Sequence, residues 1–427
     1  MSCWVRVSRL ILQRMAAADP NAVAELVLRR FGELPAKRKP AVRDNGLHEW
    51  VPLSGIVAER DGILTCLSLA TGMKCLPAAK LPQAKGNALH DWHAEVLAIR
   101  AFNRHLLDEC RQLLSGESSV LRRREHHEIS PDAPQPFAIR DGVALHMYCS
   151  EAPCGDASME LTMAAQEDAS PWDEPSPSSA TAPEQEAPGA ETTTLPGRAY
   201  FSRLGVVRRK PARGDAPPTM SKSCSDKIAL KQCTSLLSSL TSLLIDPGNA
   251  YLSSLILPET QYSAAGCERA FSARGRMASL DGRVWSGGYR FAPFEVRTTQ
   301  REFAFSKREV KARAEKIAAS NLAVAWTAGG LEEGMMGGVL QGRKAFDARG
   351  ASAVSRRRMW EDVAAIADEL GDDEHGLRRV LAGVTYADVT GSELLAARRE
   401  VKMEARREAL AGWVANVGDD EFGLPKR

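Results

Sequence analysis

Apolar runs of strand length alternate with longer segments of helical periodicity along most of the chain. Residues 62–71 (GILTCLSLAT) and 143–150 (VALHMYCS) are short apolar runs that end at turn or polar residues, and they predict buried strands. Between them, apolar residues recur at helical spacing over 94–107 and predict a buried helix. Further strands are predicted at 249–257 and 322–326. An alternation of this kind favours an α/β fold.

The C-terminal part of the chain has the pattern of helices. A Leu/Ser-rich segment predicts a helix over 226–244, and from about residue 355 the periodicity is helical throughout. The stretch 394–410 carries a row of cations, which are Arg398, Arg399, Lys402, Arg406 and Arg407. The sequence therefore predicts an α/β protein whose C-terminal part is helical.

One segment has neither pattern. From about 165 to 195 the chain is rich in Pro, Ser and Ala, and it carries acidic residues without any Lys or Arg. This composition offers too little apolar surface to offset the entropy lost on folding, so we predict a disordered acidic insertion. Directly after it the charge changes sign, because Arg208, Arg209 and Arg213 precede the next acid, Asp215. The insertion either masks this basic strip or is unrelated to it.

Length and composition exclude several classes of protein. The chain has 427 residues, of which 44% are hydrophobic and 26% are charged, as in soluble globular proteins. A wholly disordered chain, a collagen and a coiled-coil rod are therefore excluded. The formal net charge is only +2, so a nucleic-acid partner has to be sought in local clusters of cations.

The cysteines and the N-terminus bear on where the protein works. Nine cysteines without a dense spacing predict free or metal-binding thiols in a reducing compartment. No apolar run reaches the roughly 18 residues that a membrane span needs, so we expect a soluble intracellular protein without a membrane partner. Residues 1–14 are basic and contain no acid. They are either a mitochondrial presequence or the product of an upstream start codon, with the working protein beginning near Met15.

Three short motifs carry candidate chemistry. His93 and Glu95 open the helix predicted at 94–107, Cys154 follows the strand 143–150, and Cys224 precedes the helix predicted at 226–244. One imidazole and two thiolates can bind a tetrahedral zinc ion and leave its fourth position open for water, as in catalytic zinc sites. Glu95 is too close to His93 to share the helical face of a second ligand. It suits a carboxylate directed at the water instead of the metal.

The spacing of the cysteines departs from the compact zinc-deaminase signature. Zinc nucleobase deaminases combine H-x-E with P-C-x-x-C. Here the position of the second cysteine in that signature is Ala157, and Cys224 is the only convincing replacement. The sequence therefore indicates a split form of the signature.

In this order the motifs HAE, PCGD and SCSDK resemble those of the adenosine deaminases that act on RNA, or editases, and of their tRNA relatives. The stretches LPAKRKP (34–40), TGMKC (71–75), RRKPARGD (208–215), SCSDKIAL (223–230) and Gly412-Trp413 extend the resemblance. It covers about residue 15 to the C-terminus without the insertion. No double-stranded-RNA-binding domain precedes the motifs, which favours the tRNA branch of the family.

The resemblance implies a fold and an activity. The expected fold is a three-layer, cytidine-deaminase-like α/β core with a mixed central sheet and large helical embellishments around a buried polyanion site. It forms one domain over 15–427, behind the extension 1–14. The implied activity is zinc-dependent hydrolytic deamination of adenosine to inosine in tRNA, at the adenosine just 3′ of the anticodon of tRNA-Ala. We expect a monomer in the cytoplasm, the nucleus or both.

The resemblance also implies roles for individual residues. His93, Cys154 and Cys224 bind zinc, and Glu95 carries the proton to N1 of adenine and to the leaving ammonia. An inositol hexakisphosphate lies beneath the active site, and the residues that match its ligands or their links to the zinc site are Asp91, Arg100, Lys210, Lys227, Lys231, Lys402, Trp413 and Asp420. The expected RNA contacts are Arg208, Arg209, Arg213 and Asp215.

Two departures and two alternatives accompany this interpretation. The family pattern Arg-Arg is Ile99-Arg100 here, and its Arg-Trp is Leu230-Lys231, which changes the residues expected around the inositol phosphate. One alternative is a deaminase of cytosine or free nucleosides on the same scaffold, which needs no extended basic surface. The other is a non-catalytic RNA-binding protein with a structural zinc, which needs four protein ligands.

Overall fold

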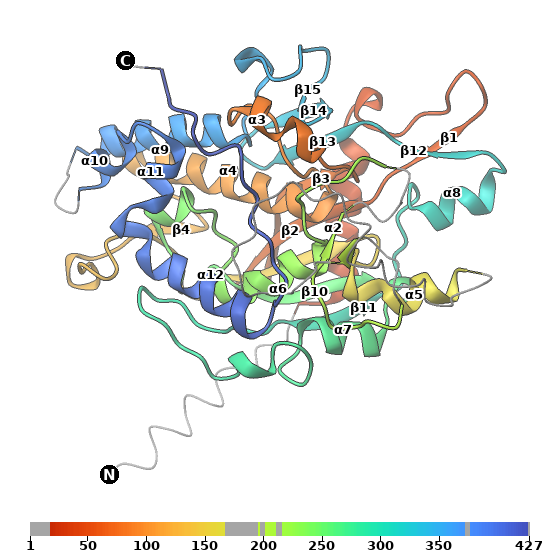
Figure 1. Cartoon of the computed structure of the whole chain (residues 1–427), viewed down its shortest axis with the longest axis horizontal. Coiled ribbons are helices and arrows are strands. Elements are labelled where there is room, and N and C mark those ends of the chain that lie inside the picture. The colour runs from red at the N-terminus through yellow and green to blue at the C-terminus, as the bar shows by residue number, and fades with distance from the viewer. Residues whose placement is uncertain (1–17, 167–194, 197–200, 211–215, 372–375, 426–427) are drawn as a thin grey trace, which may run out of the picture.

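The computed structural model describes residues 18–166, 195–196, 201–210, 216–371 and 376–425 (Figure 1). Its centre is an eight-stranded sheet in the order β11-β10-β6-β2-β3-β13-β14-β15. These strands are β2 (Leu53–Arg60), β3 (Ile63–Thr71), β6 (Ala144–Cys149), β10 (Leu252–Pro258), β11 (Glu295–Thr299), β13 (Ala323–Thr327), β14 (Glu332–Met336) and β15 (Val339–Leu340). Strands β6, β10 and β11 run parallel, whereas the other neighbouring pairs are antiparallel. The predicted α/β fold with a mixed sheet is confirmed.

Helices cover both faces of this sheet and so make three layers. The α2 helix (Pro20–Glu33) buries Phe31 against one face, and α4 (Ala94–Ser115) packs against the other. Successive side chains of β2 point to opposite faces, so that Val57 joins the apolar cluster of α2 and Ile56 joins the cluster of α4. The sheet is therefore buried on both sides, and α4 lies across its central strands β2, β3 and β13.

The remaining elements surround these layers. The other helices are α3 (Leu81–Ala84), α5 (Met159–Ala164), α6 (Cys224–Thr234), α7 (Ala264–Phe271), α8 (Lys307–Arg313), α9 (Arg356–Leu370), α10 (Leu377–Leu381), α11 (Tyr386–Gly391) and α12 (Ala396–Glu408). Among the short strands, β1 (His48–Trp50) pairs with β12 (Ile317–Ala319), and β7 (Leu195–Pro196) pairs with β8 (Arg208–Arg209). A three-stranded sheet has β5 (Phe137–Ile139) between β4 (Leu121–Arg123) and β9 (Ile245–Asp246). Figure 1 shows α9 to α12 gathered beside α4 and α6, so the predicted helical character of the C-terminal part is confirmed.

Most elements lie where the periodicity predicts them. The strands predicted at 62–71, 143–150, 249–257 and 322–326 are β3, β6, β10 and β13. The helix predicted at 94–107 is α4, which continues to Ser115.

The helix predicted over 226–244 is wrong in its second half. It ends at Thr234, because Ser235 adopts a left-handed φ of 57°. The chain beyond it is held by α4, where the Asn103 amide donates to Leu236 O (3.0 Å) and accepts from the Ser238 N–H (2.6 Å). The Ser238 hydroxyl then accepts from the Thr241 N–H at 3.1 Å. Such side-chain bonds satisfy the backbone and compete with continued helix.

Two predictions lie outside the described residues. These are the N-terminal extension 1–14 and nearly all of the acidic insertion at 165–195. Among the residues that the structure does describe, none of the helices is both long and apolar enough to cross a bilayer. The cysteines of this part of the chain are all free thiols.

Candidate active site

Three chain segments meet beside the sheet and bring the candidate metal ligands together. His93 is the residue before α4, Cys154 lies in the loop after β6, and Cys224 is the first residue of α6. The α6 helix begins at this point because the Ser223 side chain accepts a hydrogen bond from the Asp226 N–H. Each ligand is thus placed by the end of a regular element.

The loop that carries Cys154 packs directly on the start of α6. Gly155 has a φ of 105°, and a Cβ there would meet Ser223 Oγ at 2.2 Å, so only glycine allows this approach. The Ser225 N–H donates to Cys154 O at 3.0 Å, and the Cys224 N–H donates to Cys154 Sγ at 3.3 Å. Two cysteines that are 70 residues apart in the sequence are therefore held side by side.

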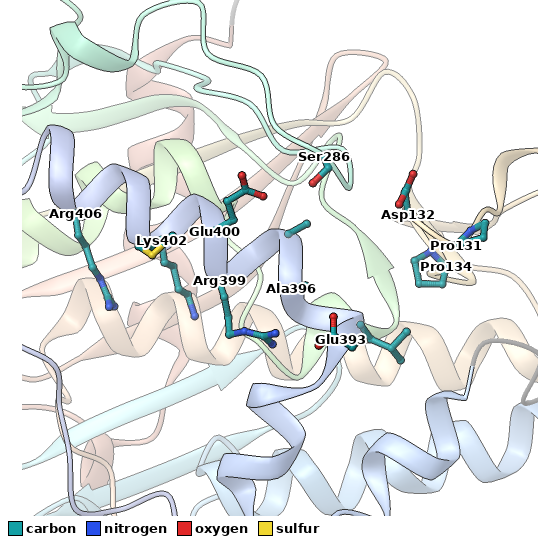
Figure 2. A pocket seen from close by; sticks show the side chains of 13 residues that line it. Pro131, Asp132, Pro134, Ser286, Glu393, Ala396, Arg399, Glu400, Lys402 and Arg406 are labelled. Atoms are coloured by element: carbon teal, nitrogen blue, oxygen red, sulfur yellow. The ribbon is translucent and has the colours of Figure 1, made fainter.

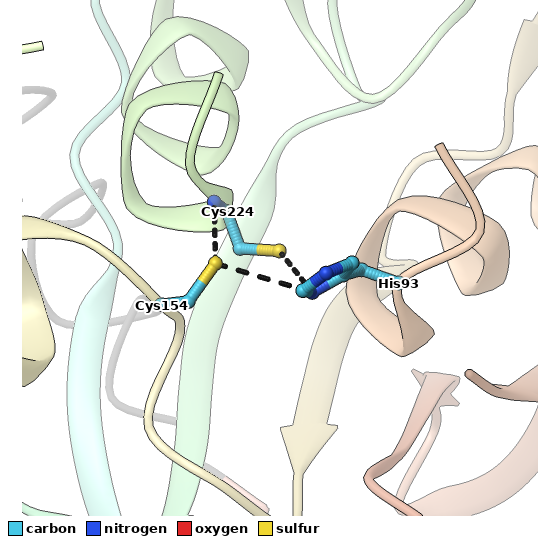
Figure 3. A group of neighbouring side chains, drawn as sticks. All are labelled: His93, Cys154 and Cys224. Atoms are coloured by element: carbon cyan, nitrogen blue, oxygen red, sulfur yellow. Dashed lines mark hydrogen bonds between the residues drawn. The ribbon is translucent and has the colours of Figure 1, made fainter. Parts of the chain in front are cut away.

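The three candidate ligand atoms have the spacing of a tetrahedral metal site (Figure 3). His93 Nδ1 lies 3.9 Å from Cys154 Sγ and 3.7 Å from Cys224 Sγ, and all three atoms lie within 4.8 Å of one another. Zinc–sulfur bonds of about 2.3 Å and zinc–nitrogen bonds of about 2.0 Å would place S and N about 3.5 Å apart. The donor set and its geometry therefore fit zinc, with a fourth position left for a non-protein ligand.

Glu95 lies in the first turn of α4 beside these ligands. It is buried with 5% of its surface exposed, and its Oε2 has no hydrogen-bond partner among the described residues. Burial raises the pKa of Glu95, and the negative charge of Cys154 raises it further. An unpartnered buried carboxyl with a raised pKa is suited to accept and return a proton.

A buried carboxylate, Asp91, ties the metal-ligand segment to two lysines. Its Oδ1 accepts the His93 N–H at 2.9 Å, which fixes the start of α4. Its Oδ2 accepts from Lys210 Nζ at 2.8 Å and from Ser221 Oγ at 2.6 Å, and Lys227 Nζ donates to the same oxygen. The structure thus brings together the three residues that the sequence predicted as a link from the zinc site.

Lys210 extends this network to the metal ligands. Its Nζ lies 3.2 Å from Cys224 Sγ as well as bonding Asp91. Burial alone would raise the pKa of Asp91, but the charges of Lys210 and Lys227 hold that pKa well below its usual range. The carboxylate is therefore ionised, and a chain of polar contacts runs from Cys224 through Lys210 and Asp91 to Lys227.

Substituting Asp91 by asparagine is expected to lower the free energy of unfolding by about 3 kcal/mol, because it removes the carboxylate that pairs with the buried ammonium of Lys210. Urea denaturation followed by circular dichroism measures this. Asp347→Asn is the matched control, since Asp347 pairs with the exposed Arg349 at the surface and its substitution should change stability little. Equal stability of the two variants would show that Asp91 does not compensate the lysines.

Two adjoining cavities of about 430 and 200 Å³ begin at this network. They share Val96, Arg100, Lys227 and Trp413 in their walls. The other polar residues that line them are His90, Asp91, Ser221, Lys222, Arg356, Arg406, Asn416, Asn103, Lys231 and Ser238. Cations outnumber acids in these walls, so the cavities suit a negatively charged group.

Several cations in and around the cavities have no ion pair with any described residue. These are Arg100, Lys222, Lys231, Arg398, Arg399, Lys402 and Arg406. Burial, and after it the charge of Arg398, holds the pKa of both Lys231 and Lys402 well below the usual range. Burial and the charge of Arg356 lower the pKa of Arg100 to about 10. Enclosing this many like charges is unfavourable unless an anion joins them.

The α12 helix supplies one row of these cations. Figure 2 shows the side chains of Arg399, Lys402 and Arg406 leaving the helix on the same side, as their spacing of three and four residues requires. They also line a cavity of about 900 Å³ along this helix. The Arg406 guanidinium and the Lys222 ammonium lie 5.0 and 5.6 Å from the centre of the Trp413 ring.

Asp420 was predicted for the polyanion site, but the neighbouring residue Asp419 lies there instead. The backbone carbonyl of Asp420 accepts the Ala387 N–H, and Asp420 lines neither cavity. The carboxylate beside the cavity is that of Asp419, whose Oδ2 lies 2.6 Å from His90 Nε2 and 3.6 Å from an Arg356 nitrogen. The loop after α12 has no periodicity from which the correct register follows.

Sequence reasoning missed His90, Lys222 and Arg356. Lys222 stands directly before the SCSDK motif and His90 directly before the DWHAE motif, which was the only signal for them. Arg356 is one of three arginines that begin α9, and nothing in that run distinguishes it.

The predicted RNA-contacting strip is only partly available at the surface. Arg208 is 1% exposed, and its backbone N–H donates to Asp226 Oδ2 at 3.0 Å. The expectation that Arg208 contacts RNA is therefore not retained, because its guanidinium is enclosed by protein. Arg209 is half-buried, whereas Arg213 and Asp215 lie outside the described residues.

Comparison with known proteins places these residues in a wider pattern. The family model for the adenosine-deaminase (editase) domain matches residues 68–417, a span that contains His93, Glu95, Cys154 and Cys224.

Individual relatives agree with this match. A tRNA-specific adenosine deaminase 1 of Schizosaccharomyces pombe is 33% identical over 407 residues, which cover 94% of this chain and 96% of the relative. The protein of the same name from Saccharomyces cerevisiae is 34% identical over 272 residues, 61% of this chain and 64% of the relative. The double-stranded RNA-specific editase Adar of Drosophila melanogaster is 27% identical over 215 residues, 46% of this chain and 28% of the relative.

Proposed function

The chain belongs to the adenosine-deaminase (editase) family, and from that premise we propose that it is a zinc-dependent enzyme that converts adenosine to inosine in tRNA. The single observation that carries the proposal is the convergence of His93, Cys154 and Cys224 within 4.8 Å beside the buried carboxyl of Glu95. The names of the full-length relatives support tRNA as the substrate.

The residues of the site have distinct roles in this reaction. His93, Cys154 and Cys224 would hold zinc, which supplies an activated water when bound. Glu95 accepts a proton from the water that attacks C6 of the adenine, and it donates that proton to N1. Glu95 then moves a second proton from the new C6 hydroxyl to the amino group, the C6–N6 bond breaks as the C6 carbonyl forms, and ammonia leaves with inosine as product. Lys210 neutralises Cys224, and Asp91 holds Lys210 in place.

We propose the adenosine just 3′ of the anticodon of tRNA-Ala as the target. An anticodon loop presents unpaired bases, so the enzyme does not have to extract the base from a duplex.

We also propose inositol hexakisphosphate as a resident cofactor of the two cavities beyond Asp91. Its support is the set of enclosed cations without ion pairs among the described residues. Arg100, Lys231 and Arg406 line these cavities and would bind its phosphates, and Lys227 would connect it to Asp91. Lys402 lines the cavity of about 900 Å³ along α12, which shares Arg406 with them, and would reach the ligand from that side. A polyanion of this charge would offset the cost of enclosing the cations.

Incubation of the zinc-loaded protein with tRNA-Ala transcript is expected to produce inosine only at the proposed position. Reverse transcription reads inosine as guanosine and so measures the conversion. A transcript with guanosine at that position is the control for other targets. Conversion of free adenosine or of cytosine, with tRNA unchanged, would support the nucleoside or cytosine deaminase instead. Zinc binding through a fourth protein ligand without any conversion would point to the non-catalytic protein.

A further inference from the structure

A basic surface with aromatic residues lies beside the active-site loop on α8. Residues 307–316 contain five cations, Lys307, Arg308, Lys311, Arg313 and Lys316, against two acids, although the whole chain has a net charge of only +2. Arg308 is paired with Glu302 and Glu309. Within the described residues, no ion pair involves Lys307, Lys311 or Arg313, all of which are exposed.

Aromatic side chains stand between these cations. The Lys307 ammonium lies 5.8 Å from the centre of the Trp50 ring, and the Arg313 guanidinium lies 5.6 Å from that of Phe305. Trp50 and Phe305 are both half-buried. Their segments lie side by side, because the N–H of Val51, the residue after Trp50, donates to Phe305 O at 2.9 Å. We call Lys307, Lys311, Arg313, Trp50 and Phe305 the α8 patch.

The α8 patch is attached to the segment that carries Cys154. The Lys307 N–H donates to Glu151 Oε1 at 2.9 Å, and Glu151 precedes Cys154 by three residues. Figure 1 shows α8 beside β1 and β12, at one edge of the molecule.

A second attachment reaches the segment that carries His93. Asn321, just after β12, accepts a hydrogen bond from the exposed Lys74 Nζ. The carbonyl of Lys74 in turn accepts the Trp92 N–H at 3.0 Å, one residue before His93. The patch is thus fixed relative to two of the three segments that build the site.

The chemistry of the α8 patch matches single-stranded RNA. Unpaired cations bind phosphates and release counterions, and partly exposed aromatic rings stack on unpaired bases. We propose that the α8 patch binds the backbone and unpaired bases of the substrate's anticodon arm and thereby holds the target adenosine over the zinc site. This inference rests on the proposed function and assigns its RNA-binding surface.

The test is to remove the positive charges of the patch with uncharged polar side chains. The variant K307Q/K311Q/R313Q keeps residues that favour a helix. The control R60Q/R123Q/R140Q removes the same charge from a basic surface beyond the far end of α4, which over its 22 residues is about 33 Å long. Fluorescence anisotropy measures tRNA affinity between 50 and 200 mM salt, and steady-state kinetics give kcat and KM.

The α8 variant is expected to bind tRNA roughly tenfold or more weakly. The slope of log K against log salt should also be smaller in magnitude by about 2, because each of the three lost phosphate contacts contributes about 0.7. KM should rise similarly while kcat at saturation changes less than about threefold. The control variant should match the wild type in tRNA affinity, in salt dependence and in the kinetic constants. Thermal denaturation checks folding, and the single variants K307Q and K311Q replace the triple variant if it unfolds.

The possible failures are distinguishable. If the wild type neither binds nor deaminates tRNA, the proposed function fails and this inference falls with it. If the wild type acts on tRNA and the α8 variant binds as tightly, only the inference is overturned. Equal weakening by the control would also overturn it, since binding would then depend on total charge instead of this surface.

Discussion

Substituting Glu95 by glutamine is expected to lower kcat for adenosine deamination by roughly 10²- to 10⁴-fold. Glutamine has the same shape but cannot accept a proton, whereas Glu95 has a buried oxygen without a partner among the described residues. The metal ligands His93, Cys154 and Cys224 are unchanged, so zinc content should stay at about one per chain. Single-turnover rates on tRNA transcript together with metal analysis measure both quantities.

Glu117→Gln provides the matched control for this variant. Glu117 is an exposed carboxylate just beyond the other end of α4, and its substitution should leave the rate unchanged. A Glu95→Gln protein that retains zinc and turns over within a few-fold of the wild type would show that a different group moves the proton. Loss of zinc in this variant would instead place Glu95 among the metal ligands.

Reversing the charge of Lys402 is expected to lower the free energy of unfolding by about 4 kcal/mol. This is the stabilisation that a ligand provides when its free concentration is about a thousand times its Kd, and the variant would lose it. In Lys402→Glu a carboxylate would enter the enclosed cluster and repel the polyphosphate that we propose it binds. The wild-type protein should release about one inositol hexakisphosphate per chain when denatured, and the variant much less. Mass spectrometry of the released ligand and urea denaturation measure these effects.

Arg407→Glu makes the same charge reversal on α12 and is the control. The Arg407 side chain is 64% exposed and lines none of the cavities described above, so its substitution should alter neither ligand content nor stability appreciably. A wild-type protein that releases no polyphosphate, together with Lys402→Glu and Arg407→Glu variants of equal stability, would contradict the proposal. The cations would then have to be balanced by another anion or by water.

Features set by residues close in the sequence were predictable. Strand β3 and helix α4 follow from apolar spacing within each segment, because that spacing decides which residues one face can bury. His93, Cys154 and Cys224 stand out for a similar reason. Each is flanked by residues that begin a helix or follow a strand, and each stands in a short motif of its own.

Features set by contacts between distant segments were not predictable. The helix predicted beyond Thr234 stops because the Asn103 side chain, from another element, binds the backbone of the following loop. Arg208 lies in a basic strip that local charge assigns to the surface, yet tertiary packing leaves it 1% exposed. At the cavity, the carboxylate that contacts His90 is that of Asp419, whereas the sequence predicted the neighbouring residue, Asp420.

The sequence by itself determined the α/β class, the order of the main elements and the identity of the three metal-binding candidates with Glu95, since these depend on periodicity and on motifs within a few residues. Only the tertiary structure decided that Lys222, Arg356 and Arg406 stand with Arg100 in the wall of one cavity, and that α8 adjoins the Cys154 loop. The physical reason is that burial and electrostatic environment depend on what packs over a side chain. Local sequence contains no record of those partners.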